Sequence, residues 1–82
     1  MSNSMHVENV SEVEMHADNL APIISDSQAS TDLIFRFLDT KIKGEVILTL
    51  TEIFERELDM TEWTIFFPER PEHEVEINII KK

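Results

Sequence analysis

The side chains that most often carry out catalysis are few in this chain of 82 residues, and their spacing matches no catalytic pattern. Without cysteine, the chain has no thiol nucleophile, disulfide bridge or thiolate zinc site. Every serine lies within residues 2–30, as do His6 and His16, and no glycine-flanked elbow holds any of them. The only glycine, Gly44, cannot form a glycine-rich loop around a phosphate. We therefore expect neither enzymatic activity nor a cofactor.

Two groups of carboxylates and histidines supply the donor types that bind metal ions. Glu8, Glu12 and His16 would share one face if their segment is helical, and residues 72–76 hold a second acidic group around His73. Neither group has a known ligand spacing, such as two histidines one helical turn apart that flank a glutamate. The sequence therefore predicts no functional metal site.

The charge of the chain is strongly negative, with 17 acidic and 7 basic residues and a formal net charge of −10. A surface of this sign argues against direct contact with nucleic acid or an anionic membrane. Closely spaced carboxylates can instead occupy the positions that phosphates take in a basic site on another protein. We therefore expect a small protein-binding module, and specifically an inhibitor that occupies the basic nucleic-acid-binding site of a partner. The acidic candidates for this contact are Glu52, Glu55, Glu69, Glu72, Glu74 and Glu76.

Aromatic residues near the end of the chain predict a second contact surface. In an extended segment, Phe66 points away from Phe67, and Ile80 points away from Ile79, so that both faces carry large apolar groups. Trp63 and Phe66 are the candidate contacts, and we expect a homodimer unless the N-terminal segment covers the second face. The alternative function is a structural or accessory subunit of a larger assembly, for example of a phage or bacterium, that self-associates through these residues.

The clearest helical pattern covers residues 45–59. Its apolar positions are Val46, Ile47, Leu50, Ile53, Phe54 and Leu58, which fall on one face of a helix. Residues 63–67 and 74–80 read as strands of an antiparallel hairpin, because Val75, Ile77 and Ile79 alternate with polar residues. The helix packed on this hairpin predicts a small domain of the α+β class.

The segment from Asp32 to Asp39 is harder to assign. Leu33, Ile34, Phe37 and Leu38 lie at helical offsets, and the sequence therefore favours a helix there. Gly44 follows a short polar stretch, and we expect it to reverse the direction of the chain.

The first thirty residues differ in composition from the rest. Residues 1–30 contain no lysine, arginine, phenylalanine or tryptophan, which predicts an acidic arm and connector, followed by a globular unit over residues 31–82. The arm has a helical face and an N-terminal cap signal at Asn9, but it also contains a short alternating stretch, so helix, strand and loose order stay open. No uninterrupted apolar run approaches the length of a bilayer span or a secretory signal, so we expect a cytoplasmic protein.

Overall fold

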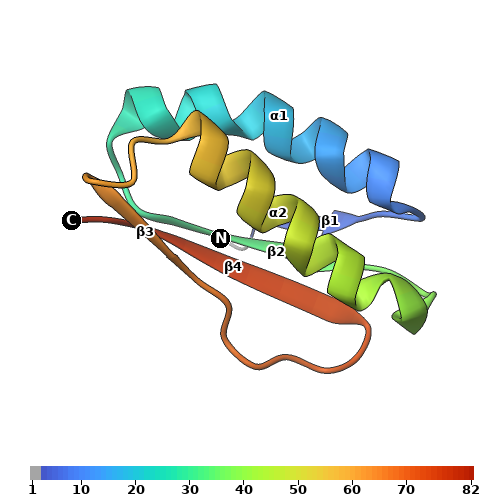
Figure 1. Ribbon diagram of the computed structural model, residues 1–82. Helices are drawn as coiled ribbons and strands as arrows, with labels where there is room; N and C mark the ends of the chain where they lie inside the picture. Colours follow the sequence, from blue (N-terminus) through green and yellow to red (C-terminus); the bar gives the residue numbers. More distant parts are fainter. Residues whose placement is uncertain (1–2) are drawn as a thin grey trace.

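The computed structural model describes residues 3–82, which form a four-stranded mixed sheet with helices on one face (Figure 1). The elements in chain order are β1 (Ser4–His6), α1 (Val10–Ser27), β2 (Thr31–Arg36), a short 3₁₀ helix (Thr40–Ile42), α2 (Lys43–Glu57), β3 (Trp63–Phe66) and β4 (Glu74–Lys81). The expected α+β class is confirmed. The helix predicted at residues 45–59 is also confirmed, and it begins and ends two residues earlier than expected.

The strand order is β1-β2-β4-β3, and it fixes the direction of both helices. β1 is parallel to β2, whereas β4 is antiparallel to both of its neighbours, β2 and β3. β2 and β3 therefore run in the same direction, and α2 connects them as α1 connects β1 to β2. Both helices must return against these strands, so they run parallel to each other, and each begins where a strand ends (Figure 1).

The expected antiparallel hairpin is present, but its second strand lies inside the sheet. β3 pairs with β4 from Trp63 opposite Lys81 to Phe66 opposite Asn78. On its other side β4 pairs with β2 from Thr31 opposite Ile79 to Arg36 opposite Glu74. The hairpin is therefore stabilised by a third strand as well as by α2.

The core lies between the inner face of the sheet and the two helices. Val75, Ile77 and Ile79 alternate toward this layer and are at most 2% exposed. Helix α1 contributes Ala17 and Ala21, both fully buried, to this core, and it packs closely against α2. One continuous cluster of buried apolar side chains thus joins both helices to the sheet.

The helix expected between Asp32 and Asp39 is wrong, because residues 31–36 form strand β2. Leu33 and Phe35 are buried while Ile34 and Arg36 face the other side, which is the two-residue period of a strand. Leu38, the last apolar residue of the supposed helical face, is 95% exposed. The helical spacing was a consequence of apolar residues on both faces of a central strand.

The expected turn at Gly44 is also wrong. Gly44 lies in the first turn of α2, and it does not have a positive φ. Among residues 3–82, the left-handed backbone conformation occurs only at Gln28, with φ of 59°. There α1 ends, and the Gln28 N–H donates to the carbonyl of Ile24 at 3.2 Å.

The N-terminal segment is an integral part of the fold, so the loosely ordered alternative is wrong and the helical one is confirmed. Asn9 caps α1, since its side-chain oxygen accepts the Glu12 N–H at 3.0 Å. Val13 of α1 is fully buried in the common core, and β1 pairs with β2. The core is therefore not divided at Ser30. Over the described residues 3–82, neither helix is long and apolar enough to cross a membrane.

Candidate functional site

The acidic residues predicted to contact a partner lie on two opposite sides of the molecule. Glu52 and Glu55 are exposed on α2. Glu74 and Glu76 alternate with the buried residues of β4 and therefore lie on the face of the sheet that the helices do not cover. We call this face the open sheet face. Glu69 and Glu72 are exposed in the loop between β3 and β4. The two acidic groups are thus not brought together into one array.

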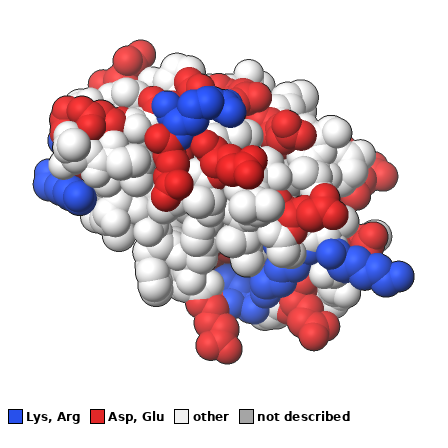
Figure 2. All heavy atoms as spheres, viewed as in Figure 1, with Lys and Arg blue, Asp and Glu red and all other residues white. Residues whose placement is uncertain are grey.

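The outer faces of α1 and α2, here called the acidic helix layer, carry most of the net negative charge. The helices hold eight acidic residues against two basic ones, a formal charge of −6: Glu12, Glu14, Asp18 and Asp26 on α1, and Glu45, Glu52, Glu55 and Glu57 on α2, with Lys43 and Arg56. Figure 2 shows acidic side chains spread over this side, with few basic ones between them. Arg56 pairs with Asp18 at 3.3 Å and with Glu57 at 2.9 Å, and this raises its pKa, chiefly through the Glu57 hydrogen bond.

Large apolar side chains are also exposed on the two helices, and Leu48 and Met15 lie beside acidic residues of the layer. Leu48 is 58% exposed and precedes Glu52 by one turn of α2, so the two lie on one helix face. Met15 is 51% exposed and precedes Asp18 by three residues on α1. The layer therefore offers apolar contacts beside its carboxylates, which is a combination found at protein interfaces.

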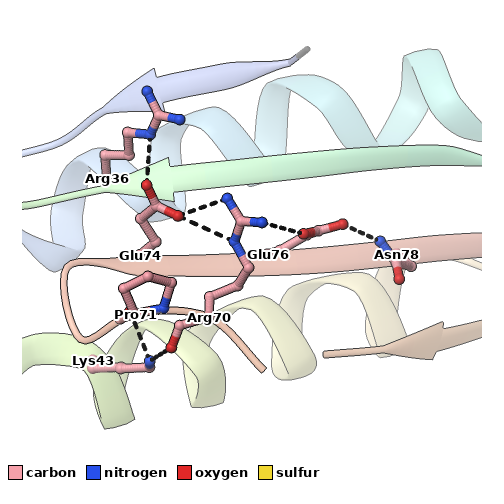
Figure 3. A network of polar contacts seen from close by, with 7 residues as sticks. All are labelled: Arg36, Lys43, Arg70, Pro71, Glu74, Glu76 and Asn78. Atoms are coloured by element: carbon pink, nitrogen blue, oxygen red, sulfur yellow. Dashed lines mark hydrogen bonds and ion pairs between the residues drawn. The ribbon is translucent and has the colours of Figure 1, made fainter. Parts of the chain in front are cut away.

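Ion pairs neutralise the carboxylates of the open sheet face (Figure 3). Glu74 accepts hydrogen bonds from Arg70 at 2.7 and 3.1 Å, and its other oxygen lies 3.0 Å from Nε of Arg36, an ion pair without the alignment of a hydrogen bond. The Arg70 hydrogen bond, more than the charge of Arg36, holds the pKa of Glu74 below its ordinary value. Glu74 is therefore engaged within the fold and is not a free contact for a partner.

The same network continues along β4 and reaches the neighbouring strand. Arg70 lies 3.6 Å from Glu76, and the Asn78 amide donates to Glu76 and to Asp32, each at 2.8 Å. Lys43 of α2 fixes the loop that carries Arg70, since its ammonium donates to the Arg70 carbonyl at 2.9 Å (Figure 3). The charged groups of the open sheet face thus satisfy one another.

Of the two predicted aromatic contacts, only Phe66 is at the surface. Trp63 is 2% exposed and belongs to the core, with the Lys81 ammonium 5.7 Å from its ring centre. Phe66 is 57% exposed on the open sheet face, on the same side as Ile80, which is 40% exposed. α1 covers the inner face of the sheet and leaves these residues open, so the N-terminal segment does not shield them.

A groove that the sequence did not indicate lies at the carboxyl ends of β1 and β2. Its volume is about 570 Å³, and its lining includes His6, Val7, Arg36, Phe37, Leu38 and His73. These residues come from separate segments, so no local spacing could have identified them. Neither histidine side chain forms a hydrogen bond with a residue in the described part of the chain, so the groove holds no positioned acid–base pair.

Two members of the first group of potential metal donors, Glu12 and His16, make contacts within the fold. The Glu12 carboxylate accepts the Glu8 N–H at 3.1 Å, and the ring of His16 lies 6.4 Å from that of Phe35. Between residues 3 and 82, no three histidine, aspartate or glutamate side chains are grouped to hold a metal ion.

Comparison with known proteins adds no functional assignment. No family model, curated protein or solved structure matches the chain. The acidic helix layer and the exposed edge around Phe66 are therefore the surfaces from which function is inferred.

Proposed function

We propose that this chain is a small acidic module that binds another protein through its acidic helix layer, at a basic surface of the kind that otherwise holds nucleic acid. The observation that supports this most is the segregation of charge. The helices carry a formal −6 on exposed side chains, whereas the carboxylates of the open sheet face are paired with Arg36 and Arg70. Of these two surfaces, the helix layer therefore has more carboxylates that are free to contact a partner.

The spacing within the layer suits this role. Glu52 and Glu55 are three residues apart on α2, so their Cβ atoms lie about 5–6 Å apart. That separation resembles the spacing of successive phosphates on a strand. Met15 and Leu48 add apolar contacts that a phosphate backbone cannot provide, and these would favour the module over nucleic acid in the same site.

The proposal is tested by changing equal charge on two sides of the molecule. The double variant Glu52→Gln with Glu55→Gln removes two exposed charges from the helix layer, and Glu69→Gln with Glu72→Gln removes two from the exposed loop. The immobilised chain is exposed to nuclease-treated extract of its source cells, and bound proteins are eluted with duplex DNA or with rising salt.

We expect the helix-layer variant to bind less of the partner protein than the unaltered chain, and the loop variant to bind as much. The two variants have the same net charge, but only the first loses carboxylates that contact the partner. Elution by duplex DNA and by salt is expected as well, since charge-led binding is screened by ions. Equal effects of the two variants, or capture that neither DNA nor salt reverses, would refute the proposal.

A further inference from the structure

β3 is an edge strand that lacks most of the usual protections against pairing with another chain. It lies at the end of the sheet order β1-β2-β4-β3, and its sequence is Trp-Thr-Ile-Phe. Natural edge strands are kept very short or carry charges, proline or bulges that prevent association, and of these devices β3 has only its short length. The four residues of β3 contain no charge, glycine or proline, so this edge is open to a further strand.

The register shows which backbone groups face outward. The Lys82 N–H donates to the Glu62 carbonyl at 2.8 Å, and Thr64 and Phe66 lie opposite Ile80 and Asn78. Hydrogen-bonded residues alternate along an antiparallel pair, so Glu62, Thr64 and Phe66 direct their backbone groups toward β4. Ile65 therefore directs its N–H and C=O away from the sheet, where they can pair with another strand.

The distribution of charge favours a second copy of this chain as the partner that pairs with the β3 edge. Two copies with a net charge of −10 repel each other wherever free carboxylates meet, which excludes contact through the helix layers. At β3 the nearest preceding acid, Glu62, is paired with Lys81 at 2.9 Å. The carboxylates of the adjoining open sheet face are paired with arginines. The β3 strands themselves can therefore approach without opposing free charges, and within the described part of the chain Glu69 of the following loop is the nearest exposed acid without an ion pair.

We propose that two copies pair through antiparallel β3 strands about a two-fold axis, forming one continuous eight-stranded sheet. The outward backbone groups allow a register with Ile65 opposite Ile65 of the second copy and Phe66 opposite Thr64. The exposed Phe66 side chain is then covered by the partner's open sheet face. Such an interface is isologous and closes at two copies. It is independent of the proposed partner contact, because a two-fold axis perpendicular to the sheet leaves both helix layers on one face and accessible.

The molar mass in solution tests the proposed dimer, with substitutions at two residues that are almost equally exposed. Phe66 and Leu48 are 57% and 58% exposed, so Phe66→Lys and Leu48→Lys make similar changes at the edge and on the helix layer. We expect the unaltered chain and Leu48→Lys to show twice the chain mass of 9.6 kDa by light scattering, and Phe66→Lys to show the single mass. Thr64→Lys, at another exposed position of β3, is expected to give the same single mass.

Hydrogen exchange at the Ile65 amide provides an independent readout. We expect this amide to be protected at high protein concentration and to exchange rapidly when the sample is diluted or when Phe66 is replaced by lysine. A single-chain mass for the unaltered protein at all concentrations would overturn the proposal. So would a dimer that persists in both β3 variants, or one that Leu48→Lys dissociates as well. These outcomes leave the capture experiment with Glu52 and Glu55 unaffected.

Discussion

Replacing Gly44 with alanine should stabilise the protein, although the sequence alone suggests the reverse. As the only glycine of the chain, Gly44 looks like the residue that a chain reversal requires. In the structure it lies in the first turn of α2, without a positive φ. A Cβ atom built at this position meets no atom within 4 Å, so the methyl group of alanine causes no collision.

The expected magnitude follows from helix propensity. Glycine inside a helix is less stable than alanine by roughly 0.5–1 kcal/mol, mainly because it loses more backbone freedom on folding. Gly44 is the second residue of α2, where the helix is least constrained, so we expect about 0.5 kcal/mol. For a domain of this size, that corresponds to a rise in Tm of about 2–4 °C.

Urea denaturation followed by circular dichroism measures this change directly. A matched substitution is Gln28→Gly, because Gln28 has the left-handed φ of 59° that glycine adopts without cost. That variant loses the side-chain hydrogen bond from Gln28 to the Ser25 carbonyl at 2.6 Å, so its net gain should also be small, about 0.5 kcal/mol. A lower urea midpoint for Gly44→Ala would show that the chain turns at Gly44 and that the start of α2 is misplaced.

The remaining predictions concern burial, capping and acid stability. Trp63→Ala should lower the free energy of unfolding by about 3–5 kcal/mol, and Phe66→Ala by less than about 1 kcal/mol in the single chain, as thermal unfolding of dilute samples will show. Asn9→Ala should cost about 1 kcal/mol in urea, since it removes the cap on the Glu12 N–H. The pKa of Glu74 is lowered in the fold, so its ion pairs stabilise the protein above the unfolded pKa of about 4.3, and this is lost as pH falls through the folded value. Glu74→Gln should therefore lower the urea midpoint at neutral pH and flatten its fall in acid; an unchanged pH profile would contradict the network.

The elements that the sequence predicted correctly are those with one buried face. α2 and β4 each separate apolar from polar positions with a clear period, and both lie between a single core and solvent. β2 was misread because it is an inner strand with large residues on both faces, such as Phe35 inside and Ile34 outside. Ile34, between the charged residues Asp32 and Arg36 of the outer face, makes a run of three apolar residues with Leu33 and Phe35 and so hides the period of two.

The surfaces were less predictable than the elements. The exposure of Glu52, Glu55 and Phe66 follows from their positions on α2 and β3. The pairing of Glu74 could not be inferred, because Arg36 and Arg70 reach it from another strand and from a loop. Trp63 was placed at the surface because the sequence does not show that the start of β3 lies over the core.

The position of β4 has a consequence for how the chain folds during synthesis. β4 is the latest strand in the chain, yet it separates β2 from β3 in the sheet. Until residues 74–81 leave the ribosome, β2 and β3 each expose an unpaired edge, and only the packing of α2 on α1 connects the β1–α1–β2 unit to the segment that contains β3. The sheet is completed in a late step, when β4 pairs with the free edges of both β2 and β3. Incomplete chains, which expose these edges, are therefore the form most prone to aggregation.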